Sequence, residues 1–343
     1  MVGADFYSKE EDNVRCLLCP HNCLIPNNKP GICKVRHNIN GVLYTDVYGK
    51  IVALHSDPIE KKPLYHFYPG RKILSVGTIG CNFHCSFCQN YQLSQCKPSD
   101  SKGEYNLSPH ELVDWAQSIP GNLGIAYTYN EPTVFFEMVR DTAVLARKTG
   151  LKNVMVTNGY INPDPLQKLL EVIDAFNIDL KAFDDSFFRK YTGGHLEPVL
   201  RSIKMVYQAG RHLEITFLVI PTLNDSTETF SEMVGWIAEE LSPDTPLHIS
   251  RYFPAWKSEL PPTSTQLIHN FAEIASQKLN YVFIGNISAT SYTSTLCPHC
   301  RNILIGRSGY STQISGITAD SRCKACGEYV SLPFVKLQNN RRG

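Results

Sequence analysis

The chain has 343 residues, with 33 Lys and Arg against 32 Asp and Glu, and 43% of its residues are hydrophobic. The net charge of +1 excludes the large basic excess typical of proteins that bind nucleic acids or anionic membranes mainly by charge. No apolar run approaches the ~18 residues of a membrane span, and the first residues lack the apolar segment of a signal peptide. We therefore expect a globular protein of the cytoplasm.

From residue 73 onward, apolar strands alternate with helices. The predicted strands cover residues 73–77, 123–127, 153–157, 176–180, 213–220, 247–250 and 281–284. Helices follow each of the first six strands, and Ser108 and Thr263 are expected to open two of them as the first residues of capping boxes. Such a pattern predicts an α/β fold with a parallel sheet covered by helices, either open or closed into a partial barrel. Functional residues are then expected where the strands end.

The two ends of the chain lack this alternation. We predict an N-terminal Cys-rich lobe over residues 1–72, a βα core over 73–289 and a separate C-terminal segment over 290–343.

Eleven of the 12 cysteines fall into three closely spaced sets. These are Cys16, Cys19, Cys23 and Cys33; Cys81, Cys85 and Cys88; and Cys297, Cys300, Cys323 and Cys326. Cysteines two or three residues apart form strained disulfides but converge readily on a metal ion or cluster, which indicates a reducing compartment. Cys96 stands apart and is expected to be a small buried apolar residue.

The central set, Cys81-x3-Cys85-x2-Cys88, follows the first predicted strand directly. Three soft thiolates on a short loop suit an iron–sulfur cluster or zinc. Three ligands on a four-iron cluster leave one iron open, which is typical of a catalytic centre and not of a closed structural one.

The outer sets each offer four thiolates. The C-terminal set, two CxxC pairs 22 residues apart, is typical of a zinc ribbon, although Arg301 stands where glycine often follows the second cysteine. An auxiliary iron–sulfur cluster is the alternative there. The N-terminal set predicts zinc or an auxiliary iron–sulfur cluster, with His21 and His37 as alternative ligands. If the N-terminal set binds no metal, its cysteines are expected to be free thiols or to form reversible disulfides.

The CxxxCxxC loop after the first strand, with Phe87 before the third cysteine, resembles the radical SAM superfamily. The resemblance implies a partial (β/α)6-type barrel and a [4Fe–4S] cluster on Cys81, Cys85 and Cys88, which binds S-adenosylmethionine. An electron from ferredoxin or flavodoxin then cleaves the S–C5′ bond, and the resulting 5′-deoxyadenosyl radical abstracts hydrogen from a substrate. The implied class is an oxidoreductase.

Polar residues at later strand ends resemble those of pyruvate formate-lyase activating enzymes. The resemblance implies contacts to S-adenosylmethionine from Asn130, Glu131, Asn158, Asp179 and Lys181. Tyr129 and Asn130 replace two glycines of the family. Two structural alternatives stay open: Glu131 caps the helix that starts at Pro132, and Asp179 forms a buried ion pair with Lys181.

The ordered motifs from Cys16 to Cys326 are similar to the radical SAM enzyme of the AmmeMemoRadiSam system, which implies AMMECR-type and Memo-type partner proteins. The substrate stays open between a protein glycyl site and a small molecule. The alternative function is a non-catalytic one, as an iron–sulfur electron carrier or a zinc-ribbon protein that binds nucleic acid. The near-neutral charge and the strand-end polar residues argue against it.

Overall fold

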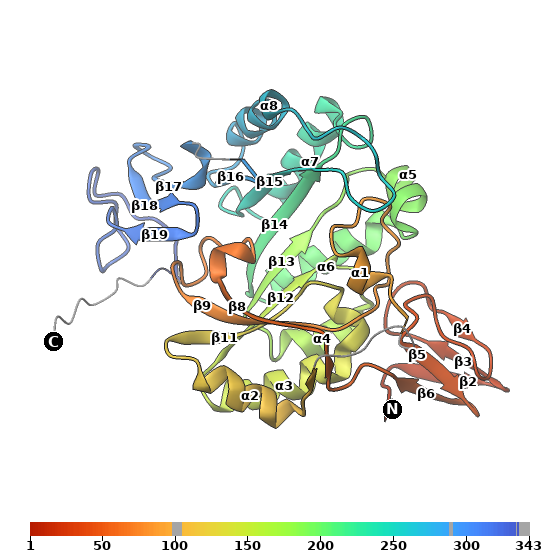
Figure 1. The fold of residues 1–343 in the computed structure, drawn as a ribbon. Coiled ribbons are helices and arrows are strands. Elements are labelled where there is room, and N and C mark those ends of the chain that lie inside the picture. The colour runs from red at the N-terminus through yellow and green to blue at the C-terminus, as the bar shows by residue number, and fades with distance from the viewer. Residues whose placement is uncertain (98–104, 288–290, 334, 336–343) are drawn as a thin grey trace. The chain divides into compact units, whose positions relative to one another are not determined.

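The computed structural model describes residues 1–97, 105–287, 291–333 and 335 (Figure 1). These residues form two compact units. The first unit comprises Met1–Asp57, Lys72–Leu213 and Pro254–Leu260. The second comprises Pro58–Arg71, Glu214–Phe253 and the described chain from Pro261 on. The three-part division at residues 72 and 289 stays a prediction. Its second boundary and residues 336–343 lie outside the described residues.

The first unit is built on a parallel sheet. Its strands are β9 (Lys72–Gly77), β11 (Asn122–Tyr127), β12 (Lys152–Thr157) and β13 (Ala175–Asp179). They pair in the order β13-β12-β11-β9, all parallel, and β8 (Ala53–Pro58) lies beyond β9. Most of their side chains are buried, as expected when helices cover a parallel sheet. The sequence pattern missed β8, because several of its residues are exposed and it lacks a continuous apolar run.

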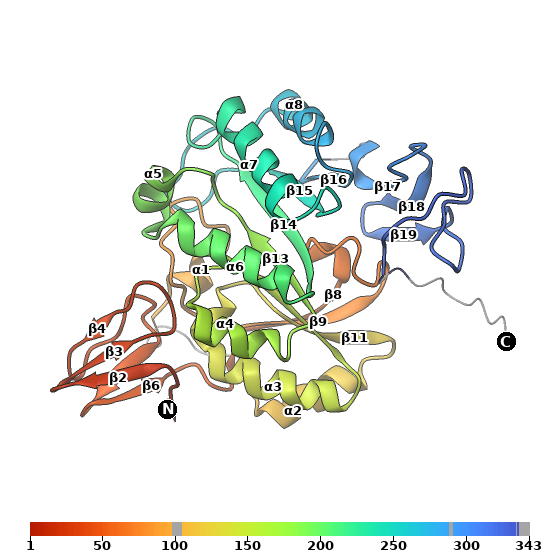
Figure 2. The same cartoon turned by 180° about the vertical axis from the view of Figure 1, so that it is seen from behind.

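Helices of the first unit lie along this sheet. The main ones are α2 (Pro109–Ser118), α3 (Phe136–Lys148), α4 (Pro163–Leu170) and α6 (Leu196–Gln208). Figure 2 shows α4 and α6 in front of the strands and α2 and α3 below them. Shorter elements are α1 (Tyr91–Ser94), η2 (Pro132–Phe135), α5 (Asp185–Phe187) and the π-helical turn η3 (Phe188–Thr192). The predicted capping box of α2 is confirmed, since Glu111 N donates to Ser108 Oγ at 3.3 Å and Ser108 N donates to Glu111 Oε2 at 2.7 Å.

The N-terminal residues of this unit form small antiparallel sheets. One contains β2 (Tyr7–Glu10), β3 (Asn13–Cys16) and β4 (Leu24–Ile25). The other contains β1 (Val2–Gly3), β6 (Val42–Thr45) and β5 (Arg36–Ile39), and β7 (Lys50–Ile51) pairs separately with β10 (Tyr105–Asn106). Asn40 and Gly41 join β5 to β6 with φ angles of 52° and 78°, which is the two-residue turn that suits the twist of a hairpin.

The second unit also contains parallel strands. These are β14 (His212–Val219), which belongs to this unit from Glu214 on, β15 (Leu247–Arg251) and β16 (Val282–Gly285). The helices of the unit are α7 (Thr227–Glu240), α8 (Thr265–Ser276) and the short η1 (Ile59–Lys61). The expected capping box at Thr263 is wrong. Ser264 caps α8 instead, since Leu267 N donates to Ser264 Oγ at 3.2 Å, and the apolar side chain of Leu267 cannot complete a capping box. The Thr263 hydroxyl instead donates to Val219 O at 2.6 Å.

A three-stranded antiparallel sheet follows in the same unit. It contains β17 (Thr295–Leu296), β18 (Ile303–Ser308) and β19 (Ser311–Ile314), after the turn η4 (Ser291–Thr293). Leu304, Ile317 and Leu332 form its core together with Phe283. Cys297 and Cys323 are buried in this core, so the C-terminal cysteine set is part of the packing of the segment.

The architecture confirms an α/β fold with a parallel sheet, while closure into a barrel stays a prediction. Among the described residues, no helix has both the length and the hydropathy needed to cross a bilayer.

Candidate functional site

The central cysteines lie on the loop between β9 and α1, and a glycine fixes the start of this loop. Gly80 has φ of 86°, which favours glycine. A Cβ on Gly80 would lie 2.7 Å from Val35 Cγ1 and 2.8 Å from the carbonyl oxygen of Cys33. The residue before Cys81 must therefore be small, because the chain around Cys33 packs directly against it.

Asn130 holds the same loop from the end of β11. Its Nδ2 donates to Thr78 Oγ1 at 3.0 Å and to Gly80 O at 2.9 Å, while its Oδ1 accepts from Thr78 N at 3.0 Å. Both ends of the amide are therefore used within the protein. A contact from this side chain to S-adenosylmethionine stays a prediction, and the visible role of Asn130 is to position the cysteine loop.

Tyr129 has the backbone conformation of the glycine that it replaces. Its φ is 72°, in the left-handed region that L-residues rarely adopt. Asn90 Nδ2 donates to its carbonyl oxygen at 2.7 Å, and its own hydroxyl donates to Asp57 Oδ2 at 2.9 Å. These contacts hold a non-glycine residue in a conformation that costs energy.

Glu131 is a buried brace between strand ends. Its Oε1 accepts from Thr133 N at 3.0 Å, from Thr133 Oγ1 at 2.7 Å and from Thr157 Oγ1 at 2.7 Å. Its Oε2 accepts from Asn158 N at 2.8 Å. Burial raises the pKa of Glu131, and these hydrogen bonds oppose that shift. Glu131 thus caps η2, as the structural alternative predicted, and also ties the end of β11 to the end of β12.

Asn158, after β12, lies beside the first cysteine of the loop. Its Nδ2 donates to Asn82 Oδ1 at 2.8 Å and is 3.9 Å from Cys81 Sγ. Asn82 in turn donates to Tyr160 O at 2.7 Å. The sequence did not single out Asn82, although its place directly after Cys81 was a signal.

Asp179 and Lys181 form an ion pair, with Lys181 Nζ 2.7 Å from Asp179 Oδ2, but the pair is half-buried and not fully buried as the structural alternative predicted. Burial lowers the pKa of Lys181, but Asp179 and the Cys85 thiol raise it more strongly, so it lies above its usual value. Asp179 keeps 35% of its side chain exposed, which leaves it accessible to a ligand. The structure therefore brings a cation and a carboxylate next to Cys85.

The central thiols are suited to a metal cluster. Burial raises the pKa of Cys85 to about 12, and burial together with Glu131 raises that of Cys81 well above its usual value. Such thiols ionise readily only when a bound metal supplies positive charge. Since each thiolate of a [4Fe–4S] centre binds a different iron, the three sulfurs need not surround one point, and in the described structure they do not lie within 4.8 Å of one another.

The C-terminal cysteines form a tight group. Cys297 Sγ lies 3.8 Å from Cys326 Sγ, and Cys300 Sγ lies 3.7 Å from Cys323 Sγ. Four thiolates on one tetrahedral zinc ion, at zinc–sulfur distances of about 2.3 Å, would be about 3.8 Å apart. Backbone N–H groups of Cys326 and Ala325 lower the pKa of Cys323 to about 7. This set can hold a single metal ion.

The two knuckles of this group share a backbone geometry. Arg301 and Gly327 follow the second cysteine of each pair with φ of 61° and 77°. Their N–H groups donate to the carbonyl oxygens of Cys297 and Cys323 at 2.9 and 2.8 Å. Arg301 therefore adopts the left-handed conformation of the glycine that zinc ribbons often have at this position.

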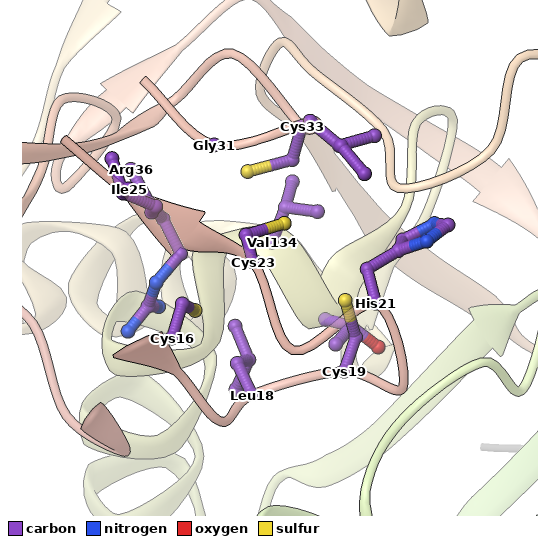
Figure 3. Close-up of a pocket in the computed structure, with 12 residues that line it drawn as sticks. Cys16, Leu18, Cys19, His21, Cys23, Ile25, Gly31, Cys33, Arg36 and Val134 are labelled. Atoms are coloured by element: carbon purple, nitrogen blue, oxygen red, sulfur yellow. The ribbon is translucent and has the colours of Figure 1, made fainter. Parts of the chain in front are cut away.

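The N-terminal cysteines line a cavity of about 20 Å³ (Figure 3). Figure 3 shows the sulfur atoms of Cys16, Cys19, Cys23 and Cys33 around a common space. Burial raises the pKa of Cys33 to about 12. His21 also lines the cavity, whereas the ring of His37 contacts the Asp46 carboxylate and is not among the lining residues.

Cys96 is not the small buried apolar residue that the sequence predicted. It is half-buried and donates to Lys97 O at 3.3 Å, so the prediction of a buried apolar role is wrong. It follows the short helix α1.

Residues 75–234 match the sequence profile of the radical SAM superfamily, and this range contains the central cysteines and all five strand-end residues. The putative glycyl-radical enzyme activating enzyme MJ1632 of Methanocaldococcus jannaschii is 30% identical over 190 residues, which cover 52% of this chain and 67% of that protein. The chain belongs to the radical SAM superfamily. The radical SAM family implies a [4Fe–4S] cluster and S-adenosylmethionine. Cys85 is buried and Cys81 and Cys88 are half-buried, and in the described structure their sulfurs do not all lie within 4.8 Å of one another, which fits such a cluster. The protein is thus a radical SAM enzyme, which cleaves S-adenosylmethionine to generate a radical.

Three further relatives show how far the similarity extends. The uncharacterized protein MJ0808 of Methanocaldococcus jannaschii is 42% identical over 338 residues, which cover 97% of this chain and 99% of the relative. Pyruvate formate-lyase-activating enzyme of Clostridium pasteurianum is 24% identical over 185 residues, 50% of this chain and 75% of that protein. The 7-carboxy-7-deazaguanine synthase of Thermococcus kodakarensis is 24% identical over 195 residues, 52% and 74% of the two chains. The last two carry different names, so similarity over about half of this chain does not define a substrate.

Proposed function

We propose that this radical SAM enzyme generates a 5′-deoxyadenosyl radical at the loop of Cys81, Cys85 and Cys88 and abstracts hydrogen from its substrate there. The supporting observation is the arrangement around this loop. Three thiols, two of them raised in pKa by burial, lie beside the Asp179–Lys181 pair and the Asn158 amide. When bound, the cluster and S-adenosylmethionine supply the one-electron cleavage of the S–C5′ bond.

The surrounding residues have two kinds of role. Lys181 would neutralise the carboxylate of S-adenosylmethionine, and Asp179, partly exposed, would accept hydrogen bonds from its ribose or ammonium group. Asn158 would contribute a polar contact beside Cys81. Glu131 and Asn130 are positioning residues, because their hydrogen bonds hold the strand ends and the cysteine loop.

The C-terminal set would hold structural zinc. The two sulfur–sulfur distances of 3.8 and 3.7 Å support this assignment, because they match a tetrahedral zinc site. All four positions are filled by cysteine, which leaves no open position for catalysis.

The partners follow from the same chemistry. A low-potential ferredoxin or flavodoxin would supply the electron, and the order of the sequence motifs supports AMMECR-type and Memo-type proteins as further partners. The closely spaced free thiols require a reducing compartment, so we place the protein in the cytoplasm.

Reductive cleavage of S-adenosylmethionine tests the proposal. Protein reconstituted anaerobically with iron and sulfide, then given dithionite and S-adenosylmethionine, should form 5′-deoxyadenosine. Cys85→Ala should abolish the product, and Cys96→Ala, outside all three cysteine sets, should leave it unchanged. Intact S-adenosylmethionine in the presence of a spectroscopically confirmed cluster on the central loop would overturn the proposal.

The substrate class needs a second readout. An activase-type enzyme should produce a glycyl-radical EPR doublet on a partner protein. An enzyme that acts on a small molecule should instead transfer deuterium from a labelled metabolite into 5′-deoxyadenosine.

A further inference from the structure

The N-terminal cysteines form a site that the radical SAM chemistry does not use. We infer that Cys16, Cys19, Cys23 and Cys33 hold a second [4Fe–4S] cluster, ligated at all four irons, which relays electrons to the centre at Cys81, Cys85 and Cys88. The relay rests on the proposed function, whereas the cluster itself does not.

The spacing of the sulfurs separates a cluster from zinc. In the part of the chain that the structure describes, the C-terminal set is the only group of three or more Cys, His, Asp or Glu ligand atoms within 4.8 Å of one another. The N-terminal sulfurs share one cavity but do not gather around a single point, even with His21 beside them. Four thiolates that each bind a different iron lie farther apart than four around one ion, so this wider set fits a cluster.

The cavity offers what a buried cluster needs. The remaining walls are largely apolar and include Leu18, Ile25 and Val134, which would exclude water (Figure 3). Cys16 is buried and the other three cysteines are half-buried.

Arg36 provides an independent sign of a missing partner. Its side chain is 1% exposed and lines the cavity. Nη1 donates to both carboxylate oxygens of Glu137 at 3.0 and 3.2 Å, and Nη2 donates to Asp5 O at 2.5 Å. Nε is buried and has no hydrogen-bond partner among the described residues. Buried donors are rarely left unpaired, and a thiolate or sulfide of the cluster would accept this N–H.

The two cysteine sets are joined by a short path within the first unit. Pro20 and His21 follow Cys19, and the ring of His21 donates from Nε2 to Asn82 O at 2.7 Å. Asn82 is bonded to Cys81. In addition, the carbonyl of Cys33 packs on Gly80, at 2.8 Å from where a Cβ would lie. Covalent bonds and one hydrogen bond therefore link the two sites.

The electron balance of the relay is simple. A low-potential one-electron donor, such as a reduced flavodoxin, reduces the N-terminal cluster, which passes that electron to the central one. There the electron cleaves the S–C5′ bond of S-adenosylmethionine to methionine and the 5′-deoxyadenosyl radical. With four cysteine ligands, the N-terminal cluster has no open iron, so electron transfer is the chemistry available to it.

Iron content tests the cluster without any need for activity. The triple variant Cys81→Ala/Cys85→Ala/Cys88→Ala, reconstituted anaerobically, should keep about four irons per chain. Its reduced EPR signal should not respond to S-adenosylmethionine. Adding Cys19→Ala and Cys33→Ala should remove this iron, while adding Cys96→Ala should not. Circular dichroism checks that the variants are folded. If a variant does not fold, the iron content of the wild-type protein tests the inference. About eight irons per chain support a second cluster, and about four contradict it.

Two outcomes would overturn the inference. One is a folded triple variant that contains no iron. This result contradicts the cluster whether the N-terminal set binds zinc or no metal. The other is a wild-type iron count of about four on the central loop alone. Failure of the proposed function looks different, because the triple variant would keep its iron while the wild-type protein would leave S-adenosylmethionine intact.

The relay has its own readout. With reduced flavodoxin as donor, Cys19→Ala/Cys33→Ala should lower the rate of 5′-deoxyadenosine formation at least tenfold, while its central cluster, counted by iron and EPR, stays loaded. An unchanged rate with flavodoxin would contradict the relay.

Discussion

Single residues near the central cysteines act mainly on the shape of the loop. Glu131, Asn130 and Gly80 each make close contacts inside the protein that fix the loop or the strand ends beside it. Sequence position predicted that Glu131 and Asn130 lie near the cofactor. The contact of Glu131 with Thr133 is local and was one of the predicted alternatives. The contacts of these two residues with Thr157 and Thr78 could not be predicted, because those partners depend on the fold.

Glu131→Gln should destabilise the protein by about 1–3 kcal/mol. Four N–H and O–H donors converge on the carboxylate, and the amide NH2 of glutamine cannot accept any of them. Denaturant unfolding measures the change. Glu239→Gln, on an exposed side chain, should change the free energy of unfolding by less than about 0.5 kcal/mol. Equal effects of the two substitutions would contradict the brace role of Glu131.

Gly80→Ala should lower both stability and the iron content of the central loop. Besides the φ of 86°, its Cβ would clash with Val35 and with the Cys33 carbonyl. Gly150→Ala is a matched control, since Gly150 has φ of 82° and nothing within 4 Å of the added Cβ. The control should cost about 1–2 kcal/mol from backbone strain alone and leave iron binding intact. Thermal unfolding and iron analysis give the comparison; the same result for both variants would rule out the packing argument.

At the scale of elements, local patterns predicted the helices and strands of the βα series well. The capping box at Ser108 was predictable because both partners lie within four residues. The start of α8 was misplaced because Thr263 has a long-range partner, Val219 O, that leaves the cap to Ser264. The antiparallel strands of the N-terminal region are short and partly exposed, so they carry little apolar pattern.

The knuckles of the C-terminal segment give a prediction at this scale. Arg301 has φ of 61°, so Arg301→Gly should make the metal-loaded protein more stable than Arg301→Ala by about 1 kcal/mol, because only glycine adopts this conformation without strain. The denaturant midpoints of the two metal-loaded variants show which of them is more stable. The reverse order would show that the left-handed turn is not maintained in solution.

For the whole molecule, the sequence identified three cysteine sets but left zinc and an iron–sulfur cluster open at the two outer sets. Both outer sets contain a CxxC pair, and spacing along the chain does not reveal how far apart the sulfurs lie in space. In the described residues, the four C-terminal sulfurs lie close enough together to bind one metal ion, whereas the sulfurs of the N-terminal set do not. The two compact units likewise depend on long-range contacts and could not be read from composition.

The most direct test of the account is the amount of 5′-deoxyadenosine formed per chain by the wild-type protein and by Cys81→Ala/Cys85→Ala/Cys88→Ala, both reconstituted with iron and sulfide and reduced with dithionite. We predict product from the wild-type protein and none from the triple variant, even though the variant keeps the iron of its N-terminal cluster. Product from the triple variant at the wild-type level, or none from the wild-type protein with its central cluster loaded, would contradict the central claim that this loop generates the radical.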